Sequence, residues 1–381
     1  MKSYNVIIIG AGPAGSFLAY KLGQIGISVL LLDKEKFPRY KICAGGLSKK
    51  SYDILFSENK KIQGIIKNII RKGLYVKNKK LIFTDSKKDL IYMTYRSDLD
   101  DFLVKMATEK KSVEFEDNIT ITDIKKEENF ICYKSKDKEQ IVKYDVLVGA
   151  WGVNKKLNML VDLIPFDRYS VSSSWEGPAN PKYGKFSNEY AVCQIFKNHH
   201  GVVGYIFPKK DKITAGLFTS LDKKLNLEKV WEEFISFWNL DKKIQPRFSQ
   251  ISIRDYKKPI AKNNILLVGD AAGLADPFTG EGIYYALKSS IIASNEIKNH
   301  LNKKNYDLSN KYNNKIKKDL YDGQKWAKRY EFLFHHFTKL SFWLGSEFSI
   351  GNYILNSFIT GELKYNELTE IIKYSTKRIF H

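Results

Sequence analysis

The sequence has few cysteines, few arginines and no long apolar run. Its three cysteines, Cys43, Cys132 and Cys193, are an odd number and lack the spacing of a metal site. A disulfide framework is therefore excluded, and a reducing, cytoplasmic location is expected. No stretch reaches the roughly 18 apolar residues that a membrane-spanning helix requires. Glycines interrupt the apolar N-terminal stretch, so we do not expect it to be a signal peptide.

Acidic residues are also in deficit. The 381 residues include 63 Lys and Arg against 42 Asp and Glu, a formal net charge of +21 at pH 7. Only eight of the 63 are Arg, and the lysines are scattered among many Asn and Ile. Because nucleic-acid readers concentrate Arg on one face, we expect no nucleic-acid partner. Attraction to an anionic membrane surface stays open, and would place the protein peripherally at the inner membrane face.

The chain opens with the pattern of a strand, a helix and a second strand. Residues 4–9 are a solid apolar run typical of a buried parallel strand, residues 13–23 have helical spacing, and "ISVLLLDK" from Ile27 is a second buried strand. This order is typical of a βαβ unit.

A G-x-G-x-x-G motif joins the first strand to the helix. Gly10 permits the tight turn, Gly12 lets the backbone approach a pyrophosphate, and Gly15 lets helix and strand pack closely. The free N–H groups of the helix N-terminus favour an anion there. Asp33 follows Gly15 by 18 residues, where an acid accepts the ribose hydroxyls of a dinucleotide.

A second glycine-bearing unit lies far along the chain. A strand from Ile265 leads into "LLVGDAAGLADPFTGEG", residues 266–282, and a long helix begins at about Gly282. This segment resembles the second FAD signature of the family related to para-hydroxybenzoate hydroxylase. The resemblance implies that Asp270 takes the ribityl hydroxyls and that Pro277 and Gly280 run beside the flavin ring. A helix N-terminus near Gly282 would stabilise the negative charge of a reduced flavin.

Four segments together resemble the geranylgeranyl reductase family of FAD-dependent oxidoreductases. They are "FPRYKICAGGLS", "YRSDLDDFL", "GYIFPKKDKITAGL" and "TGEGIYYALKS", which lie in order up to about residue 290. The resemblance implies that the segment around Cys43 packs against the flavin, that Arg96 lies on the cofactor side, and that residues 207–209 lie near the substrate cavity. It implies the reduction of carbon–carbon double bonds in a polyprenyl group carried by a lipid.

These motifs give a set of expected site residues. Contacts with FAD are expected from Gly10, Gly12, Ala14, Gly15, Asp33, Lys34, Cys43, Ala44, Gly45, Arg96, Asp270, Gly280, Gly282 and Ile283. Substrate contacts are expected from Gly46, Tyr205, Phe207 and Pro208. No metal site is expected, because adjacent histidines, as in residues 199–200 and 335–336, point in different directions in a strand or helix.

Three positions depart from the family pattern. Tyr205 stands where Trp is usual and Val203 where Tyr is usual, which bears on the shape of the substrate. The "GADG"-type motif of the wider flavoprotein family contains Trp151 in place of Asp, and Trp cannot supply a carboxylate.

Cys43 is the expected catalytic residue. An isolated alkene cannot stabilise a carbanion, so its reduction needs a proton source beside the reduced flavin in a dry cavity. Gly45 and Gly46 are expected to let the Cys43 loop lie close to the ring or substrate. A thiol is protonated at neutral pH but is a weak acid, so a positioning or flavin-tuning role stays open.

Other functions and electron donors also stay open. The same fold supports a flavin monooxygenase, and a non-catalytic basic flavoprotein that binds membrane or nucleic acid is a further alternative. The chain has no separate second G-x-G-x-x-G domain for a nicotinamide. NAD(P)H and a ferredoxin-like carrier are therefore equally compatible as electron donor.

The expected fold is mixed α/β, with a Rossmann-like FAD-binding domain, an inserted antiparallel-sheet substrate domain and a helical C-terminal region. The FAD-binding domain is expected to comprise residues 1–60, 90–160 and 255–300, the substrate domain residues 61–89 and 161–254, and the C-terminal region residues 301–381. Within them, helices are expected over 98–110, with Asp98 as N-cap, and over 227–240, and strands over 118–133 and 139–149.

Overall fold

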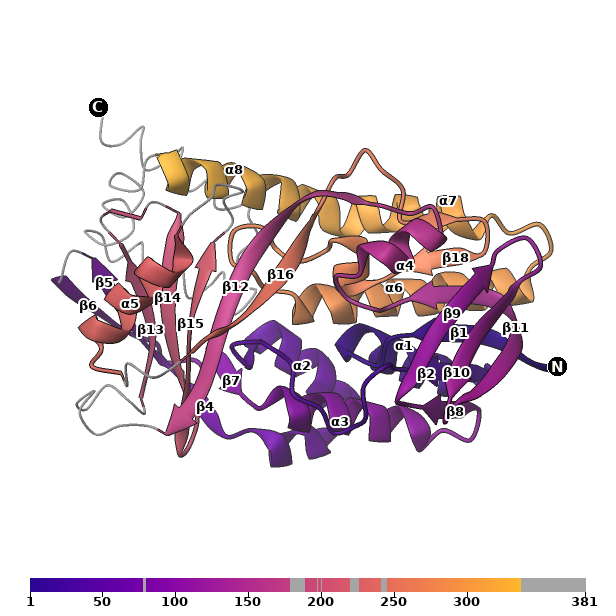
Figure 1. Ribbon diagram of the computed structural model, residues 1–381, viewed down its shortest axis with the longest axis horizontal. Helices are drawn as coiled ribbons and strands as arrows, with labels where there is room; N and C mark the ends of the chain where they lie inside the picture. Colours follow the sequence, from indigo (N-terminus) through magenta and orange to yellow (C-terminus); the bar gives the residue numbers. More distant parts are fainter. Residues whose placement is uncertain are drawn as a thin grey trace.

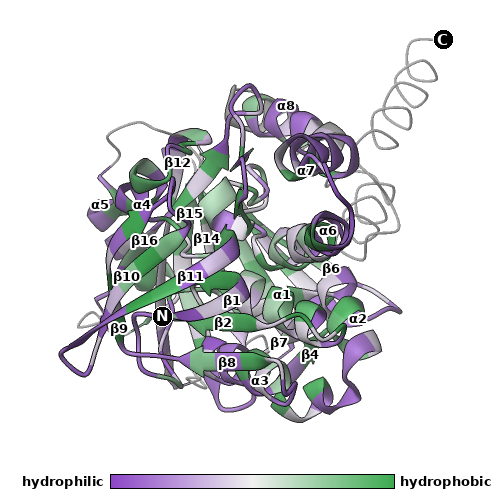
Figure 2. Cartoon of the chain, turned by 90° about the vertical axis from the view of Figure 1, so that its right-hand side faces the viewer, coloured by the Kyte–Doolittle hydropathy of each residue, from purple (hydrophilic) through white to green (hydrophobic). Residues whose placement is uncertain are grey.

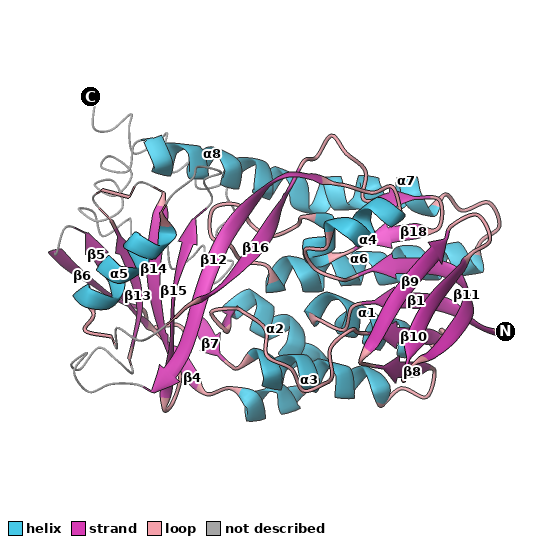
Figure 3. Cartoon of the chain, viewed as in Figure 1, coloured by secondary structure: helices cyan, strands magenta, loops and turns pink. Residues whose placement is uncertain are grey.

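The computed structural model describes residues 1–77, 80–178, 189–196, 198–199, 201–219, 226–240 and 245–336. Two large sheets follow one another along the long axis of the molecule, and helix α8 (Asp322–His336) runs along one side between them (Figure 1). The architecture is the mixed α/β fold expected from the sequence, with helices and strands in both halves (Figure 3).

The first sheet is mainly parallel and contains, within the described chain, eight strands. Its order is β17-β18-β11-β1-β2-β8, and β10 and β9 extend it from the first half of β11. The solid apolar runs of β1 and β2 are buried, as expected of strands covered on both faces. The strands are β1 (Lys2–Ile9), β2 (Val29–Leu32), β8 (Val113–Glu116), β9 (Ile119–Lys125), β10 (Phe130–Ser135), β11 (Lys138–Gly149), β17 (Ala261–Lys262) and β18 (Ile265–Leu267).

The second sheet is mainly antiparallel and has the order β16-β12-β15-β14-β13-β5-β6 in the described residues. Side chains alternate between its two faces. Ile206, Ala215 and Leu217 pack with helix α5 (Leu227–Phe237) in one apolar cluster. The strands are β5 (Lys72–Lys77), β6 (Lys80–Asp85), β12 (Phe166–Pro178), β13 (Tyr190–Ile195), β14 (Val202–Pro208), β15 (Lys212–Thr219) and β16 (Arg247–Arg254).

A small sheet and several helices complete the fold. The sheet consists of β3 (Gly46–Ser48), β7 (Ile91–Met93) and β4 (Asn68–Ile70), in that order. Helices α1 and α6 pack together, and the Ser290 hydroxyl donates to the Ala14 carbonyl at 2.7 Å. The remaining helices are α1 (Pro13–Gly23), α2 (Lys49–Glu58), 3₁₀ helix η1 (Lys60–Ile65), α3 (Arg96–Thr108), α4 (Lys155–Leu160), 3₁₀ helix η3 (Gly269–Ala272), α6 (Ile283–Asn302), α7 (Leu308–Ile316) and π-helical turn η4 (Lys317–Tyr321).

Two local expectations need correction. The single strand expected over 118–133 is two strands, β9 and β10, because the polar residues 126–129 form a turn in which Asn129 adopts a positive φ. Figure 2 shows this part of the sheet reaching away from the body, with hydrophilic turns. Helix α3 has Tyr95 as N-cap rather than Asp98, whose carboxylate pairs with Lys67 at 2.9 Å.

Three further expectations concern the domain boundaries, the C-terminal region and membrane-spanning helices. Strands β5 and β6 join the second sheet while β4 joins the small sheet, so the domain boundaries within residues 61–89 stay a prediction. Residues 337–381, including Trp343, lie outside the described residues, as does most of the turn expected at 176–185. Among the helices that are described, none combines the length and apolarity needed to cross a membrane.

Candidate active site

The glycine loop lies between the end of β1 and the start of α1. Gly10 has a φ of +109°, and a Cβ there would lie 2.3 Å from the Ala150 carbonyl oxygen. A Cβ on Gly15 would lie 1.8 Å from the Gly10 carbonyl oxygen, so both positions require glycine. Gly12 is the N-cap of α1 without a side-chain cap, and a Cβ there would meet only the Arg39 guanidinium, at 3.6 Å. The helix N-terminus therefore has open space beside it.

Asp33 closes β2 against this loop. One of its carboxylate oxygens accepts the Ala11 N–H at 2.7 Å and the other accepts the Glu35 N–H at 2.9 Å, and the residue is only 6% exposed. Lys34 is exposed and pairs with the Glu35 carboxylate at 3.6 Å, and its positive charge also acts on Lys41. Ala14 is buried where α1 meets the loop before η3, 3.0 Å from the position of a Gly269 Cβ.

Two arginines converge on one buried carboxylate. Asp100 on α3 is fully buried and accepts Arg96 Nε and Nη2, each at 2.8 Å, and Arg39 Nη2 at 3.0 Å. Burial alone would lower the pKa of Arg96, but the Asp100 carboxylate outweighs it and the net direction is upward. The second terminal nitrogen of Arg39, Nη1, is buried without a hydrogen-bond partner in the part of the chain described. It is a donor available to a ligand beside the α1 N-terminus.

Asp270 in η3 presents a carboxylate with no side-chain hydrogen bond from any described residue. A Cβ on Gly282, the N-cap of α6, would lie 3.3 Å from Asp270 Oδ1. Burial raises the pKa of Asp270, while the positive charges of Lys41 and Arg96 act in the opposite direction. Lys41 is exposed overall, but its ammonium lies close to other protein atoms. Desolvation of this ammonium is the largest cause that lowers the pKa of Lys41, and repulsion from Arg96 is a smaller one.

Cys43 lies next to these cations. Its half-buried sulfur accepts the Gly45 N–H at 3.4 Å, and the Arg96 guanidinium is within hydrogen-bonding reach of it. Lys209 and Tyr205, both from β14 and the turn after it, are also near enough to interact electrostatically with the thiol. The structure therefore brings Cys43, Arg96 and Asp270 together.

The glycine pair after Cys43 packs closely against other parts of the protein. Gly45 has a φ of +76°, and a Cβ there would lie 2.3 Å from the Thr94 carbonyl oxygen and 2.9 Å from Lys209 Nζ. A Cβ on Gly46 would lie 2.8 Å from Ile91. The space beside both glycines is filled by protein, so they serve the close approach of β3 to β7 and to Lys209.

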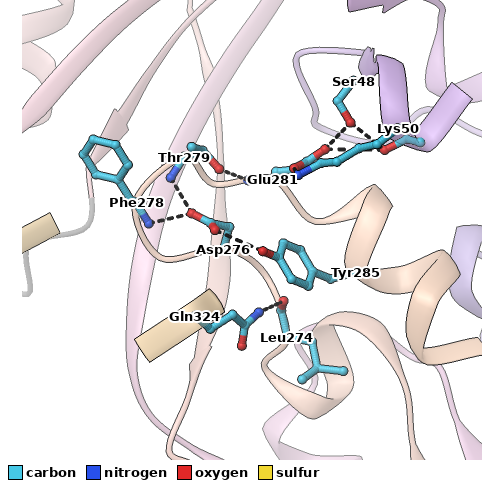
Figure 4. Close-up of polar contacts among 10 residues, drawn as sticks. Ser48, Lys50, Leu274, Asp276, Phe278, Thr279, Glu281, Tyr285 and Gln324 are labelled. Carbon is cyan, nitrogen blue, oxygen red and sulfur yellow. Dashed lines mark hydrogen bonds and ion pairs between the residues drawn. The ribbon is translucent and has the colours of Figure 1, made fainter. Parts of the chain in front are cut away.

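The loop before α6 is tied to the segment that follows Cys43 (Figure 4). The Glu281 carboxylate accepts the Ser48 hydroxyl in a short contact and pairs with Lys50 at 2.7 Å. Asp276, itself buried, accepts the N–H groups of Phe278 and Thr279 at 3.0 and 2.8 Å. These contacts fix the loop that contains Gly280 and Gly282, and Ile283 begins α6 as a buried residue.

An aromatic surface of the second sheet faces this loop. The Tyr205 hydroxyl donates to the Ser173 carbonyl at 2.7 Å, and its ring centroid lies 5.4 Å from that of Phe207. A Cβ on Gly46 would lie 3.7 Å from Phe207, and one on Gly280 would lie 2.9 Å from the Phe218 ring. We call Tyr205, Phe207 and Phe218 the aromatic face. Pro208 is buried behind it, with its carbonyl bound by Asn68 at 3.2 Å.

Trp151, the departure from the "GADG" motif, has a structural explanation. Its indole N–H donates to the Asn158 side chain at 2.9 Å, and the Asn158 amide donates to the Ala271 carbonyl at 3.1 Å. Trp151 therefore supports η3 through Asn158.

The described histidines take other partners. No group of three His, Cys, Asp or Glu side chains suited to a metal occurs among the described residues. His199 instead lies 3.1 Å from the Glu233 carboxylate, and His200 lies outside the described residues.

Sequence reasoning missed several polar residues at this site. The missed residues are Arg39, Lys41, Asp100 and Glu281. The "PRYK" stretch beside Cys43 and the four-residue spacing of Arg96 and Asp100 were usable signals, because residues four apart meet on a helix. Nothing in the sequence indicates that Lys209 approaches Gly45.

Comparisons with known proteins place this site in a class. Residues 3–177 match the FAD binding domain family, and the cofactor is FAD. The chain is 31% identical over 357 residues to an uncharacterised protein of Methanosarcina barkeri, covering 92% of this chain and 85% of that protein. It is 26% identical over 322 residues to digeranylgeranylglycerophospholipid reductase of Methanococcus vannielii, covering 80% of this chain and 79% of the relative.

A halogenating enzyme is also similar. The 1H-pyrrole-2-carbonyl-[peptidyl-carrier protein] brominase of Pseudoalteromonas luteoviolacea is 27% identical over 326 residues, with 78% of each chain covered. Among solved structures, a geranylgeranyl bacteriochlorophyll reductase-like protein of Thermoplasma acidophilum has the same fold, with a TM-score of 0.76, 21% identity and 87% of each chain covered. The fold and site thus define an FAD-dependent oxidoreductase. Within that class, the chain belongs to the geranylgeranyl reductase family.

Proposed function

We propose that this protein is an FAD-dependent reductase that saturates carbon–carbon double bonds of a polyprenyl, geranylgeranyl-type group carried by a lipid. The relative named digeranylgeranylglycerophospholipid reductase supports this substrate class. The observation that carries the proposal is the position of the Cys43 thiol, beside a guanidinium and next to the aromatic face. The electron donor is NAD(P)H or a ferredoxin-like carrier.

The residues present fit FAD. The unpartnered Arg39 Nη1 and the uncapped N-terminus of α1 are donors suited to a pyrophosphate. The Asp270 carboxylate, which no described side chain engages, is an acceptor suited to ribityl hydroxyls. We propose that the cofactor is held by these groups with Gly12 and Asp33, and that Gly282 at the α6 N-terminus lies beside the flavin.

The chain must supply the proton and a dry cavity. Reduced FAD, when bound, supplies the hydride. Cys43 gives its thiol proton to one carbon of the double bond before or together with the arrival of the hydride at the other carbon, so that no carbanion forms, and a thiolate remains. The Gly45 N–H and the Arg96 guanidinium both point to the sulfur, so they stabilise that anion. By stabilising the thiolate, the same groups would make the Cys43 thiol a better proton donor.

The substrate would lie along the aromatic face. Tyr205 and Phe207 are held by the sheet, and the Tyr205 hydroxyl is already satisfied by Ser173. Such a surface presents rings without an unpaired polar group, which suits an isoprenoid chain. We propose that Gly46 and Pro208 shape the same cavity.

The direct test is reduction of a prenyl lipid. FAD-loaded protein would be reduced chemically without oxygen and mixed with digeranylgeranylglycerophospholipid, and each saturated bond would appear in mass spectrometry as two added hydrogens. Cys43→Ser is expected to retain FAD and to slow saturation at least tenfold, whereas Cys132→Ser, a change at another half-buried cysteine, on β10, is expected to leave the rate unchanged. A Cys43→Ser protein with wild-type turnover would remove the thiol from the mechanism.

A second candidate is an oxygen-using flavin enzyme, a monooxygenase or halogenase, which the brominase similarity favours. Substrate-coupled oxygen consumption would support it, and anaerobic saturation of the prenyl chain would contradict it. A non-catalytic role requires that FAD be bound without any prenyl turnover. Peripheral membrane contact, which the net charge of +21 favours, is tested by salt-sensitive flotation with anionic vesicles.

A further inference from the structure

Lys209 is a fully buried ammonium at the end of β14. Its Nζ forms a short ion pair with the Glu176 carboxylate of β12, and the Thr214 hydroxyl donates to the same carboxylate oxygen at 3.2 Å. The Tyr95 ring lies beside Nζ, with its centroid 4.4 Å away. Burial lowers the pKa of Lys209, and the Glu176 carboxylate opposes that shift. A buried lysine is costly, so its retention at this place calls for a reason.

The ammonium lies directly behind the Cys43 loop. Lys209 Nζ is 2.9 Å from the position that a Gly45 Cβ would occupy, and the Gly45 N–H donates to the Cys43 sulfur at 3.4 Å. The charged groups that interact with Lys209 are Glu176, Asp98 and Cys43, from three different segments. Only a glycine at 45 lets the ammonium come this close to the loop.

We propose that Lys209 is the proton reservoir that restores the Cys43 thiol after each reduction. This inference rests on the proposed function. The step is balanced: an N–H bond of the Lys209 ammonium breaks, an S–H bond forms on the Cys43 thiolate, and a neutral amine and a neutral thiol result. The hydride pair comes from reduced FAD, and the external two-electron donor reduces the flavin again.

The neighbouring donors cannot fill this role. Arg96 is held by two hydrogen bonds to Asp100, and a guanidinium does not release its proton in proteins. The Gly45 N–H is an amide. A buried lysine, by contrast, readily changes its protonation state. The Glu176 side chain is 22% exposed while Lys209 is not exposed at all, so the ion pair connects the buried amine to solvent.

The test separates the first turnover from later ones. The double variant Lys209→Met with Glu176→Gln removes the ammonium without leaving a buried carboxylate unpaired. With chemically reduced enzyme and digeranylgeranylglycerophospholipid, the first saturation is expected to slow only severalfold, because it needs no proton from Lys209 although the Cys43 thiolate loses one nearby cation. Steady-state turnover is expected to fall at least tenfold and to recover with added imidazolium buffer. The control Lys210→Met removes an exposed lysine next in sequence and is expected to change neither rate.

A second variant and a substrate-free readout guard against misfolding and against failure of the proposed function. Lys209→Arg keeps the positive charge but not the transferable proton, so it is expected to lose steady-state turnover. Its rate of Cys43 alkylation by iodoacetamide at pH 8, followed by mass spectrometry, is expected to stay near wild type. The double variant is expected to alkylate at least threefold more slowly, because the thiolate loses a cation.

Three outcomes would overturn or redirect the inference. Wild-type steady-state turnover in both variants, or an equal slowing of first and later turnovers, overturns the reservoir. An unchanged alkylation rate in the double variant overturns the coupling between Lys209 and Cys43. A wild-type protein that saturates no prenyl bond, but whose double variant still alkylates slowly, overturns the proposed function and supports the coupling.

Discussion

Two glycines with almost the same backbone conformation allow a controlled test of the Cys43 loop. Gly45 has a φ of +76° and Gly26, in the turn after α1, has a φ of +75°. A Cβ on Gly26 would have no atom within 4 Å, whereas a Cβ on Gly45 would lie 2.3 Å from the Thr94 carbonyl oxygen. Alanine at either position therefore introduces the same left-handed strain, and only at Gly45 does it also collide with protein.

The expected magnitudes follow from these contacts. Gly26→Ala should lower the free energy of unfolding by about 1–2 kcal/mol, the cost of a left-handed L-residue. Gly45→Ala adds overpacking of about 1–3 kcal/mol. It also weakens the hydrogen bond from the Thr94 N–H to the Gly45 carbonyl, 2.8 Å long, worth about 0.5–1.5 kcal/mol. Together, Gly45→Ala should cost about 2.5–6.5 kcal/mol.

Urea titration followed by tryptophan fluorescence measures both variants. A lower midpoint with an unchanged slope gives the loss of stability directly. Cys43 alkylation in native buffer adds a local readout, because displacement of the loop moves the sulfur away from the Gly45 N–H. A Gly45→Ala protein no less stable than Gly26→Ala would refute the close approach of β3 to Thr94 and Lys209.

Three further substitutions test the site. Burial raises the pKa of Asp270, so ionisation of its carboxyl destabilises the folded protein at pH 7. Asp270→Asn should therefore leave the FAD-free protein at least as stable as wild type at pH 7, and this difference should vanish as the pH falls below the ordinary carboxyl pKa of 3.8. In a fluorescence titration, the affinity of Asp270→Asn for FAD should fall at least tenfold. Asp100→Asn leaves two buried guanidinium groups unpaired and should lower the free energy of unfolding in urea titration by about 3–5 kcal/mol. Asp98→Asn, on the same helix, removes a partly exposed ion pair with Lys67 and should lower it by under about 1 kcal/mol. Glu281→Gln should lower the melting temperature and speed proteolysis near residue 48, since its pair with Lys50 is lost.

Local patterns were sufficient for much of the fold. The solid apolar runs predicted β1 and β2, and the glycine motif predicted the turn before α1, because each depends on residues adjacent in sequence. Residues 118–133 were wrongly read as one strand, since alternation continues across a polar turn and does not by itself reveal the reversal. Asp98 has the residue type of an N-cap, but a tertiary partner, Lys67, takes its carboxylate.

Sequence motifs pointed to some residues of the candidate site, but contacts between segments far apart in the sequence were not predicted. Cys43, Arg96 and Asp270 lie close together, and their contacts with FAD stay a prediction. The glycine pair after Cys43 was singled out from the sequence, but its fit against Thr94 and Lys209 was not expected. That fit depends on a strand more than 160 residues away, which no local pattern encodes.

The bond from Ser290 to Ala14 and the contact of Ser48 with Glu281 have a consequence for how the protein is made. Partners separated by 276 and 233 residues join the two ends of the flavin-binding half. In the first sheet, β11 pairs in parallel with β1 on one side and with β18 on the other, so this part of the sheet is incomplete until β18 has been synthesised. A nascent chain that has not yet released α6 from the ribosome therefore cannot complete the cofactor site. Truncated fragments that end before α6 should emerge as apoproteins, and fragments that end before β17 should in addition leave the edge of β11 uncovered.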